Sequence, residues 1–269
     1  MRADDRDTLH PPQHPAAPDA GTDALPGPCG ALDTPDRARR QALKQAACIA
    51  GLMAAQGVSA ASGNTAVRRH GRALLVDAFG DPIRARNLVP GAAHVFTYPF
   101  RATPAFLIAL PAATGPTPLQ TEAKEAYEAP RGVGPQGAIV AFSAICAHKL
   151  MYPTRQISFI GLRKGHGDEP AQVIHCCGDQ SRYDPIRGAR VIGGPAPQPL
   201  AAVLLEWDAK TDQLHATGTA GGEMFDAFFE RFAFKLEMEH GPRARQPVGA
   251  TAVTLPAASY SKQWQTCKA

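Results

Sequence analysis

Two short apolar runs in this chain each end in cysteine, and this placement constrains the fold more than any other feature. The run 137–145 leads into Cys146-Ala147-His148, and the run 172–175 leads into Cys176-Cys177. Short apolar runs bounded by turn residues are typical of buried strands. Thiol and imidazole groups are donor types of metal sites. The sequence therefore predicts two strand-end loops that carry metal ligands.

The chain from residue 64 onward has the same strand-like texture. Turn signals such as Gly80-Asp81-Pro82 and Pro90-Gly91 separate its short apolar and β-branched runs. The further predicted strands are 73–76, 94–98, 105–110, 201–207 and 213–218. With 25 glycines, 25 prolines and only 19% charged residues, a helical bundle or coiled coil is disfavoured. We therefore expect a mainly β domain over 64–220.

The C-terminal region carries one helical pattern. Apolar side chains recur at helical spacing within 221–240, at Phe225, Phe228, Phe229, Phe232 and Leu236. This predicts an amphipathic helix whose apolar face packs on the β domain, or alternatively docks a partner subunit. Prolines and glycines punctuate residues 241–269, so a loose tail is expected there, with Cys267 as a spectator.

The first 61 residues have the composition of a leader. Residues 1–38 contain seven prolines and few large apolar side chains, which predicts disorder. In 39–61, paired Arg39-Arg40 followed by a modest apolar run resembles a twin-arginine export signal. That run falls short of the roughly 20 residues that span a bilayer, so the segment is either a cleaved signal or an N-terminal anchor. A periplasmic protein, free or anchored to the inner membrane, is expected.

Charge and cysteine content exclude two further classes. A formal net charge of +4 is too small to indicate nucleic-acid binding. Six cysteines are too few for a disulfide scaffold in 269 residues. Two of the six, Cys29 and Cys48, lie in the leader, so a role has to be found mainly for the cysteines of the two loops.

The sequence after the second loop adds a family resemblance. It reads Ser181-Arg182-Tyr183-Asp184 and then Gly194-Pro195-Ala196-Pro197-Gln198-Pro199-Leu200. Together with Cys146-Ala147-His148, these segments resemble the Rieske iron–sulfur family, whose pattern is Cys-x-His, Cys-x-x-His, Ser-x-Tyr-Asp and Gly-Pro-Ala-Pro-x-x-Leu. The resemblance covers residues 64–208. It implies an antiparallel β-sandwich with an inserted cluster-binding subdomain, whose cluster loops are 146–151 and 175–184.

The resemblance also implies a cofactor and a function. Rieske proteins bind a [2Fe–2S] cluster through two Cys on one iron and two His on the other. Ser181 and Tyr183 match the hydroxyls that donate to cluster sulfur or a ligand thiolate. The proline loop Gly194-Pro195-Ala196-Pro197 is assigned to the same cofactor site. The implied protein is an exported electron carrier in a membrane respiratory chain, such as the iron–sulfur subunit of a ubiquinol–cytochrome c reductase-like complex.

The partners expected from the resemblance are a respiratory membrane complex or a c-type cytochrome. Nucleic acid is not expected as a partner, and membrane contact would come from the N-terminal segment. The chain after the β domain is too short for a mononuclear-iron catalytic domain, which argues against a ring-hydroxylating oxygenase.

The second loop departs from the family pattern because it lacks the expected His. Spacing counted back from Ser181 pairs Cys176 with Asp179, whereas a loop shorter by one residue pairs Cys177 with Gln180. We prefer Cys177 and Gln180, since a single substitution converts His to Gln. His175 and His166 are further candidates if the loop bends.

A second departure concerns a disulfide between the two ligand loops. Lys149, Leu150 and Met151 follow His148 where a cysteine would be needed, so no disulfide between the two loops is expected. Two alternatives follow from the departures. The chain could be a cluster-free structural or assembly subunit, or a zinc module using Cys146, His148, Cys176 and Cys177.

Overall fold

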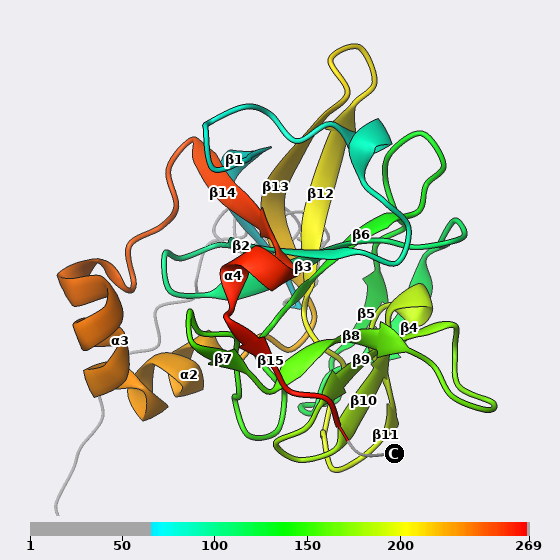
Figure 1. Ribbon diagram of the computed structural model, residues 1–269. Helices are drawn as coiled ribbons and strands as arrows, with labels where there is room; N and C mark the ends of the chain where they lie inside the picture. Colours follow the sequence, from blue (N-terminus) through cyan, green and yellow to red (C-terminus); the bar gives the residue numbers. More distant parts are fainter. Residues whose placement is uncertain (1–65, 268–269) are drawn as a thin grey trace, which may run out of the picture. The chain divides into compact units, whose positions relative to one another are not determined.

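A computed structural model describes residues 66–267 of the chain, so the predicted leader and the predicted signal or anchor lie outside the described residues. The largest element is a closed barrel with strand order β1-β13-β12-β6-β3-β2-β14 (Figure 1). Its strands are β1 (Val67–Val76), β2 (Ala93–Thr97), β3 (Pro104–Ala109), β6 (Ile139–Ser143), β12 (Ala202–Asp208), β13 (Gln213–Ala220) and β14 (Thr251–Pro256). The barrel closes because β14 pairs in parallel with β1 and antiparallel with β2.

Strand β3 shows why the barrel strands read as continuous apolar runs. Its residues are all buried, and they alternate between two hydrophobic clusters. Leu107 belongs to the cluster within the barrel, together with Leu75 and Phe96. Phe106 and Ile108, which point to the opposite face of the strand, belong to a second cluster outside the barrel. Because both faces of the strand are covered, no polar alternation appears in the sequence.

The second cluster joins the barrel to a smaller subdomain inserted between β6 and β12. This subdomain holds a four-stranded antiparallel sheet in the order β11-β10-β9-β8. Its strands are β8 (Ile160–Lys164), β9 (Gln172–Cys176), β10 (Ser181–Asp184) and β11 (Arg190–Gly193), preceded by the short β7 (Ile157–Ser158). A separate hairpin consists of β4 (Thr117–Gln120) and β5 (Ala126–Ala129). The expected mainly β fold with an inserted subdomain is confirmed, and its large sheet closes on itself as a barrel.

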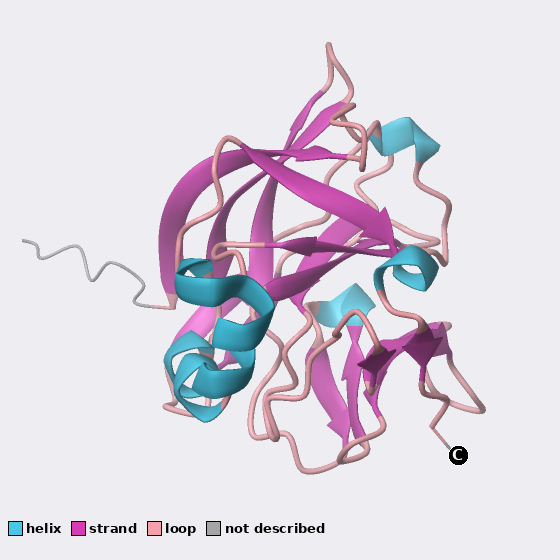
Figure 2. Cartoon of the chain, turned by 60° about the vertical axis from the view of Figure 1, so that its left-hand side comes forward, coloured by secondary structure: helices cyan, strands magenta, loops and turns pink. Residues whose placement is uncertain are grey.

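The predicted C-terminal helix is two helices, α2 (Phe225–Arg231) and α3 (Ala233–His240), seen beside the barrel in Figure 2. They are separated at Phe232, whose backbone (φ −108°, ψ 16°) is not helical. The predicted apolar face is nevertheless correct, since four of its five members are buried: Phe225, Phe228, Phe229 and Leu236. They pack on Ile145, Leu150 and Tyr152, around the first cysteine loop.

The expectation of a loose tail over 241–269 is wrong. Strand β14 completes the barrel, α4 (Ala257–Tyr260) follows it, and β15 (Gln263–Trp264) pairs in parallel with β7. Along β14, Ala252 and Thr254 are buried while Thr251 and Val253 are exposed. This alternation fits a strand, but its weakly apolar residues between prolines hide it in the sequence.

Short 3₁₀ helices occur at Ala85–Asn87, Pro185–Arg187 and Gly241–Arg243. No helix within 66–267 is long and apolar enough to cross a membrane.

The packing of α2 predicts a large effect of truncating Phe228. Its side chain is fully buried, with its ring centroid 4.9 Å from that of Tyr152 and 5.5 Å from that of Phe229. Phe228→Ala should lower the free energy of unfolding by about 3–5 kcal/mol, because it removes buried apolar area and leaves a cavity. Urea denaturation would measure this. Phe234→Ala is the matched control: Phe234 is 78% exposed, so a change within about 0.5 kcal/mol is expected. Equal effects would contradict the assignment of α2 to the core.

Candidate metal centre

The first ligand loop follows β6 and is closed by its own backbone. The N–H of Cys146 donates to the carbonyl of Met151 at 2.9 Å, and the N–H of Leu150 donates to the carbonyl of Cys146 at 3.0 Å. Leu150 takes a left-handed backbone conformation (φ 58°) to allow this closure. The Cys146 side chain is fully buried, whereas that of His148 is 38% exposed. The loop thus presents a thiol from its base and an imidazole near its rim.

The second ligand loop is the tight turn between β9 and β10. The N–H of Gln180 donates to the carbonyl of Cys176 at 2.7 Å, and Gln180 has a left-handed backbone (φ 65°). The proline loop packs directly on this turn at Gly194. A Cβ on Gly194 would lie 2.5 Å from the Cα of Ser181, so only glycine permits this approach. The proline loop of 194–197 therefore backs the second ligand loop.

The two loops bring a compact group of donors together. The ligand atoms of Cys146, Cys176 and Asp179 all lie within 4.8 Å of one another. Asp179 Oδ2 is 3.2 Å from Cys146 Sγ and 3.1 Å from His148 Nδ1. Cys146 and Cys176 are both buried free thiols. Cys146, Cys176 and Asp179 thus form a three-residue donor group, and His148 lies beside it through its contact with Asp179. Thiol, carboxylate and imidazole groups are all donor types of metal sites.

Two hydroxyl side chains accompany this donor group. The N–H of Ala147 donates to the Tyr183 hydroxyl oxygen at 3.2 Å, which leaves the Tyr183 proton free to point at Cys146 Sγ, 3.3 Å away. By hydrogen-bond geometry the buried Ser181 hydroxyl has no partner among the described residues, although it lies close enough to the Asp179 carboxylate to help lower the pKa of that carboxyl. A buried hydroxyl without a hydrogen-bond partner costs free energy, unless a bound group that is not part of the chain accepts its hydrogen bond. The Tyr183 hydroxyl therefore lies beside the Cys146 thiol.

The electrostatics of the group favour a cation. A hydrogen bond from the Cys176 thiol, with a second from Tyr183, lowers the pKa of Cys146, while the same Cys146 contact and burial raise the pKa of Cys176. Burial opposes ionisation of Asp179, but hydrogen bonds from the Ser181 N–H and from Cys146 hold its pKa below the usual value. Among the described residues, no lysine or arginine pairs with Asp179. The pKa of Cys146 and the pKa of Asp179 are thus both held below their usual values at adjacent ligand atoms.

The preference for Cys177 as a ligand, in its pairing with Gln180, is wrong. Cys177 forms a disulfide with Cys267, so Cys177 offers no thiolate, and Cys267 is not a spectator. Neighbouring side chains at the end of a strand point to opposite faces, so Cys176 faces the donor group and Cys177 faces away. The other predicted pairing, Cys176 with Asp179, is the one that the structure brings together. The spacing counted back from Ser181 was the signal that favoured it.

Gln180 and His175 instead make hydrogen bonds outside the donor group. The Gln180 amide donates to the Cys177 carbonyl at 3.3 Å, and its Oε1 is 3.2 Å from His175 Nε2. The opposite ring nitrogen, His175 Nδ1, accepts from Arg163 Nε at 2.8 Å. Neither His175 nor His166 belongs to the donor group found in residues 66–267. These contacts orient the turn from outside the group.

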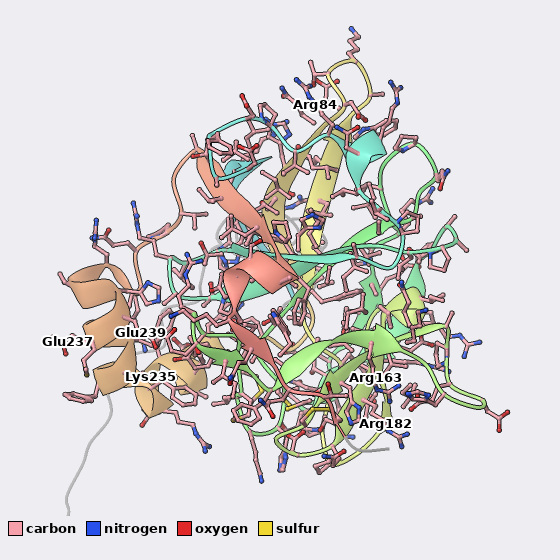
Figure 3. The ribbon with its side chains drawn as sticks, in the orientation of Figure 1. Arg84, Arg163, Arg182, Lys235, Glu237 and Glu239 are labelled. Carbon is pink, nitrogen blue, oxygen red and sulfur yellow. A yellow bond between two sulfur atoms is a disulfide. The ribbon has the colours of Figure 1, made fainter. Side chains whose placement is uncertain are left out.

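An ion-pair network ties the strands beneath the second loop. Glu169 accepts from Arg163 Nη1 at 2.6 Å and Nη2 at 3.0 Å, and from Arg182 Nη1 at 2.8 Å. Figure 3 shows the two arginines side by side on the small sheet. The hydrogen bonds from Arg163 are the main reason that the pKa of Glu169 falls to about 2. The network joins β8, β10 and the hairpin between β8 and β9.

No protein-family model matches the chain. Among solved structures, the crystal structure of the soluble domain of Rieske protein II from Sulfolobus acidocaldarius is similar to it at 28% sequence identity. That match covers 57% of this chain and 82% of the other, with a TM-score of 0.40.

The Glu169 network predicts a pH-dependent contribution to stability. A carboxyl whose pKa falls from 4.5 to about 2 on folding stabilises the fold fully above pH 4.5, and loses this as the pH falls toward 2. Glu169→Gln should therefore lower the free energy of unfolding by about 1–2 kcal/mol at pH 7, after discounting for solvent screening. The difference from wild type should vanish near pH 2. Urea denaturation over this pH range measures it.

Asp168→Asn is the matched control for Glu169→Gln. Asp168 lies in the same hairpin, is exposed, and makes no ion pair with another described residue. Its substitution should leave stability unchanged at both ends of the pH range. A pH-independent effect of Glu169→Gln would contradict the electrostatic explanation.

Proposed function

We propose that this chain is a Rieske-type electron-transfer protein whose [2Fe–2S] cluster is bound by two cysteines, one histidine and one aspartate. Cys146 and Cys176 would hold one iron, and His148 and Asp179 the other. The observation that carries the proposal is the meeting of two buried free thiols and a carboxylate from two facing loops, with the His148 imidazole in contact with that carboxylate. This set keeps the division into a sulfur side and a non-sulfur side that characterises Rieske centres.

The surroundings of the donor group support this cofactor. The cluster, when bound, would supply a site that accepts and returns one electron. The unpartnered Ser181 hydroxyl and the Tyr183 hydroxyl beside Cys146 Sγ would donate hydrogen bonds toward sulfur. Such bonds stabilise the more negative, reduced state. The chain's own residues therefore position and tune the electron acceptor.

Replacement of the second imidazole by Asp179 has a chemical consequence. Carboxylate is an anionic, hard oxygen donor, so it lowers the reduction potential relative to a neutral imidazole. It also leaves His148 as the single ligand that could exchange an imidazole proton. The donor set therefore favours simple electron relay over proton-coupled oxidation of a quinol.

The proposal includes export by the twin-arginine route to the periplasm. The Cys177–Cys267 disulfide supports it, because disulfides persist in oxidising compartments and are rare in the cytosol. In that compartment the electron partner would be a respiratory membrane complex or a c-type cytochrome. The segment 39–61 would be either removed or kept as the inner-membrane anchor.

A second candidate is a mononuclear zinc site. The close spacing of the Cys146, Cys176 and Asp179 ligand atoms, with His148 beside them, favours it. Two thiolates, a carboxylate and an imidazole suit tetrahedral Zn²⁺. The Cys146–His148–Cys176–Cys177 version of this site is wrong, because Cys177 is in the disulfide.

Metal analysis separates the two candidates. The purified full-length chain should contain iron and acid-labile sulfide in equal amounts, and should give a [2Fe–2S] electron paramagnetic resonance signal after reduction with dithionite. Zinc without iron or sulfide would overturn the cluster proposal in favour of the mononuclear site.

Asp179→His tests the assignment of the fourth ligand. It exchanges an anionic donor for a neutral one, so the midpoint potential should rise by on the order of 100 mV. Potentiometric titration measures it. Gln180→His is the matched control on the adjacent residue, and it should leave the potential near its original value because Gln180 faces His175 and the Cys177 carbonyl. A response to Gln180→His but not to Asp179→His would contradict the ligand set.

Substitution of the arginine pair tests export. Arg39→Lys together with Arg40→Lys should cause the protein to accumulate in the cytoplasm, because the twin-arginine machinery reads that pair. Cell fractionation and immunoblotting would show it. Arg37→Lys is the matched control, because Arg37 is a nearby arginine outside the pair, and it should leave export intact. Normal periplasmic yield from the double variant would contradict this route.

A further inference from the structure

The C-terminal residues 257–267, which we call the strap, lie along the segment that leaves the first ligand loop. Four strap residues donate hydrogen bonds to backbone carbonyls within 154–158, at distances of 2.5–3.1 Å: Ser261, Lys262, Gln263 and Gln265. Figure 1 shows this red segment beside β7. The strap is thus fastened along residues 261–265 to the chain that connects the first ligand loop to the small sheet.

The middle of the strap is seated by Trp264. Its indole N–H donates to the Ala257 carbonyl at 2.8 Å, and its ring packs over Gly161 on β8. A Cβ at Gly161 would lie 2.9 Å from that ring, so glycine there makes room for the indole. The Phe106 ring of the barrel is 6.4 Å away, centroid to centroid. Trp264 therefore anchors the strap across the joint between barrel and subdomain.

The far end of the strap is covalently fixed to the second ligand loop. Cys267 is bonded to Cys177, which is adjacent to Cys176 of the donor group. The Cys177 N–H also donates to the Phe159 carbonyl at 2.6 Å. The strap therefore connects the exit of the first ligand loop to the second loop. No cysteine directly follows His148 to form a disulfide between the two loops. The strap, a separate segment of the chain, connects them instead.

We propose that the strap is a latch on the metal loops that opens when a dithiol reduces the Cys177–Cys267 bond. The bond is accessible, since both cysteines are only partly buried, whereas the free thiols Cys146 and Cys176 are buried. The dithiol supplies two electrons and two protons. The protein S–S bond breaks, two protein thiols form, and the dithiol becomes a disulfide.

Opening follows from how little else holds the strap. Strand β15 has two residues and α4 has four, and most residues of 262–266 are exposed. Short, exposed elements with few hydrogen bonds open locally at small free-energy cost. Once unlatched, the strap no longer restrains Cys177, and the turn that carries Cys176 and Asp179 opens more often. The proposal rests on the proposed function only for the presence of a metal at that turn.

Hydrogen exchange on the full-length chain tests the latch without reference to metal. The Cys177→Ser/Cys267→Ser double variant removes the bond and leaves no extra thiol beside Cys176. Amide exchange at Gln263, Gln265 and Gln180 should become at least about tenfold faster than in wild type. Treating wild type with dithiothreitol should reproduce the effect, and the same treatment should add nothing in the double variant. Unchanged exchange at these amides overturns the proposal.

Metal release provides the second measurement. The rate at which a chelator removes the metal present in the purified protein should rise at least about fivefold in the double variant. Cys29→Ser/Cys48→Ser is the matched control, since it makes the same chemical change while retaining the Cys177–Cys267 bond. Faster amide exchange with unchanged metal release overturns the latch as a control on the metal. If the purified chain contains no metal, the proposed function is contradicted instead. The rate of amide exchange at Gln180 then still decides whether the strap restrains the turn.

Discussion

The structure depends on holding two ligand loops against each other. Cys146 Sγ and Asp179 Oδ2 approach to 3.2 Å, and the hydrogen bonds around them favour the charged form of each. The Cys146 thiol donates to the Asp179 carboxylate across the two loops, and each loop is also held by contacts outside the donor group. The first loop is closed by its own backbone, and the second is a tight hairpin turn backed by the proline loop. Tyr183 connects them, because its hydroxyl reaches the backbone of Ala147 and the thiol of Cys146.

The C-terminal segment provides most of this external support. Helices α2 and α3 pack their aromatic face against Leu150 and Tyr152, directly after the first ligands. Strand β14 closes the barrel, and the strap then leads to the second ligand loop. Sequence patterns assigned this region to a helix and a loose tail. In the structure it is continuous with both the barrel and the proposed metal centre.

The strands and the helical face were predictable because their signals are local. Apolar runs bounded by glycine and proline located the barrel strands and β9, and the spacing of Phe225, Phe228, Phe229 and Leu236 located the buried helical face. Strand β14 was missed because its stability comes from pairing with β1, far away in the chain, rather than from its own modest hydrophobicity. The break between α2 and α3 at Phe232 was missed for a related reason. The apolar side chains before and after Phe232 reach the core although the helix is interrupted, so their spacing does not reveal the interruption.

The sequence by itself determined which chemistry is available: three loop cysteines, the imidazole of His148, the hydroxyls of Ser181 and Tyr183, and no histidine at the Cys-x-x-His position of the second loop. Only the tertiary structure decided between Cys176 and Cys177. The alternation of side chains at the end of β9 directs one sulfur inward, and the left-handed turn at Gln180 brings Asp179 rather than Gln180 to the donors. It also placed Cys267 against Cys177, because their meeting depends on the path of the strap across 154–161. Local pattern cannot specify a contact between residues 90 positions apart, and only packing does so.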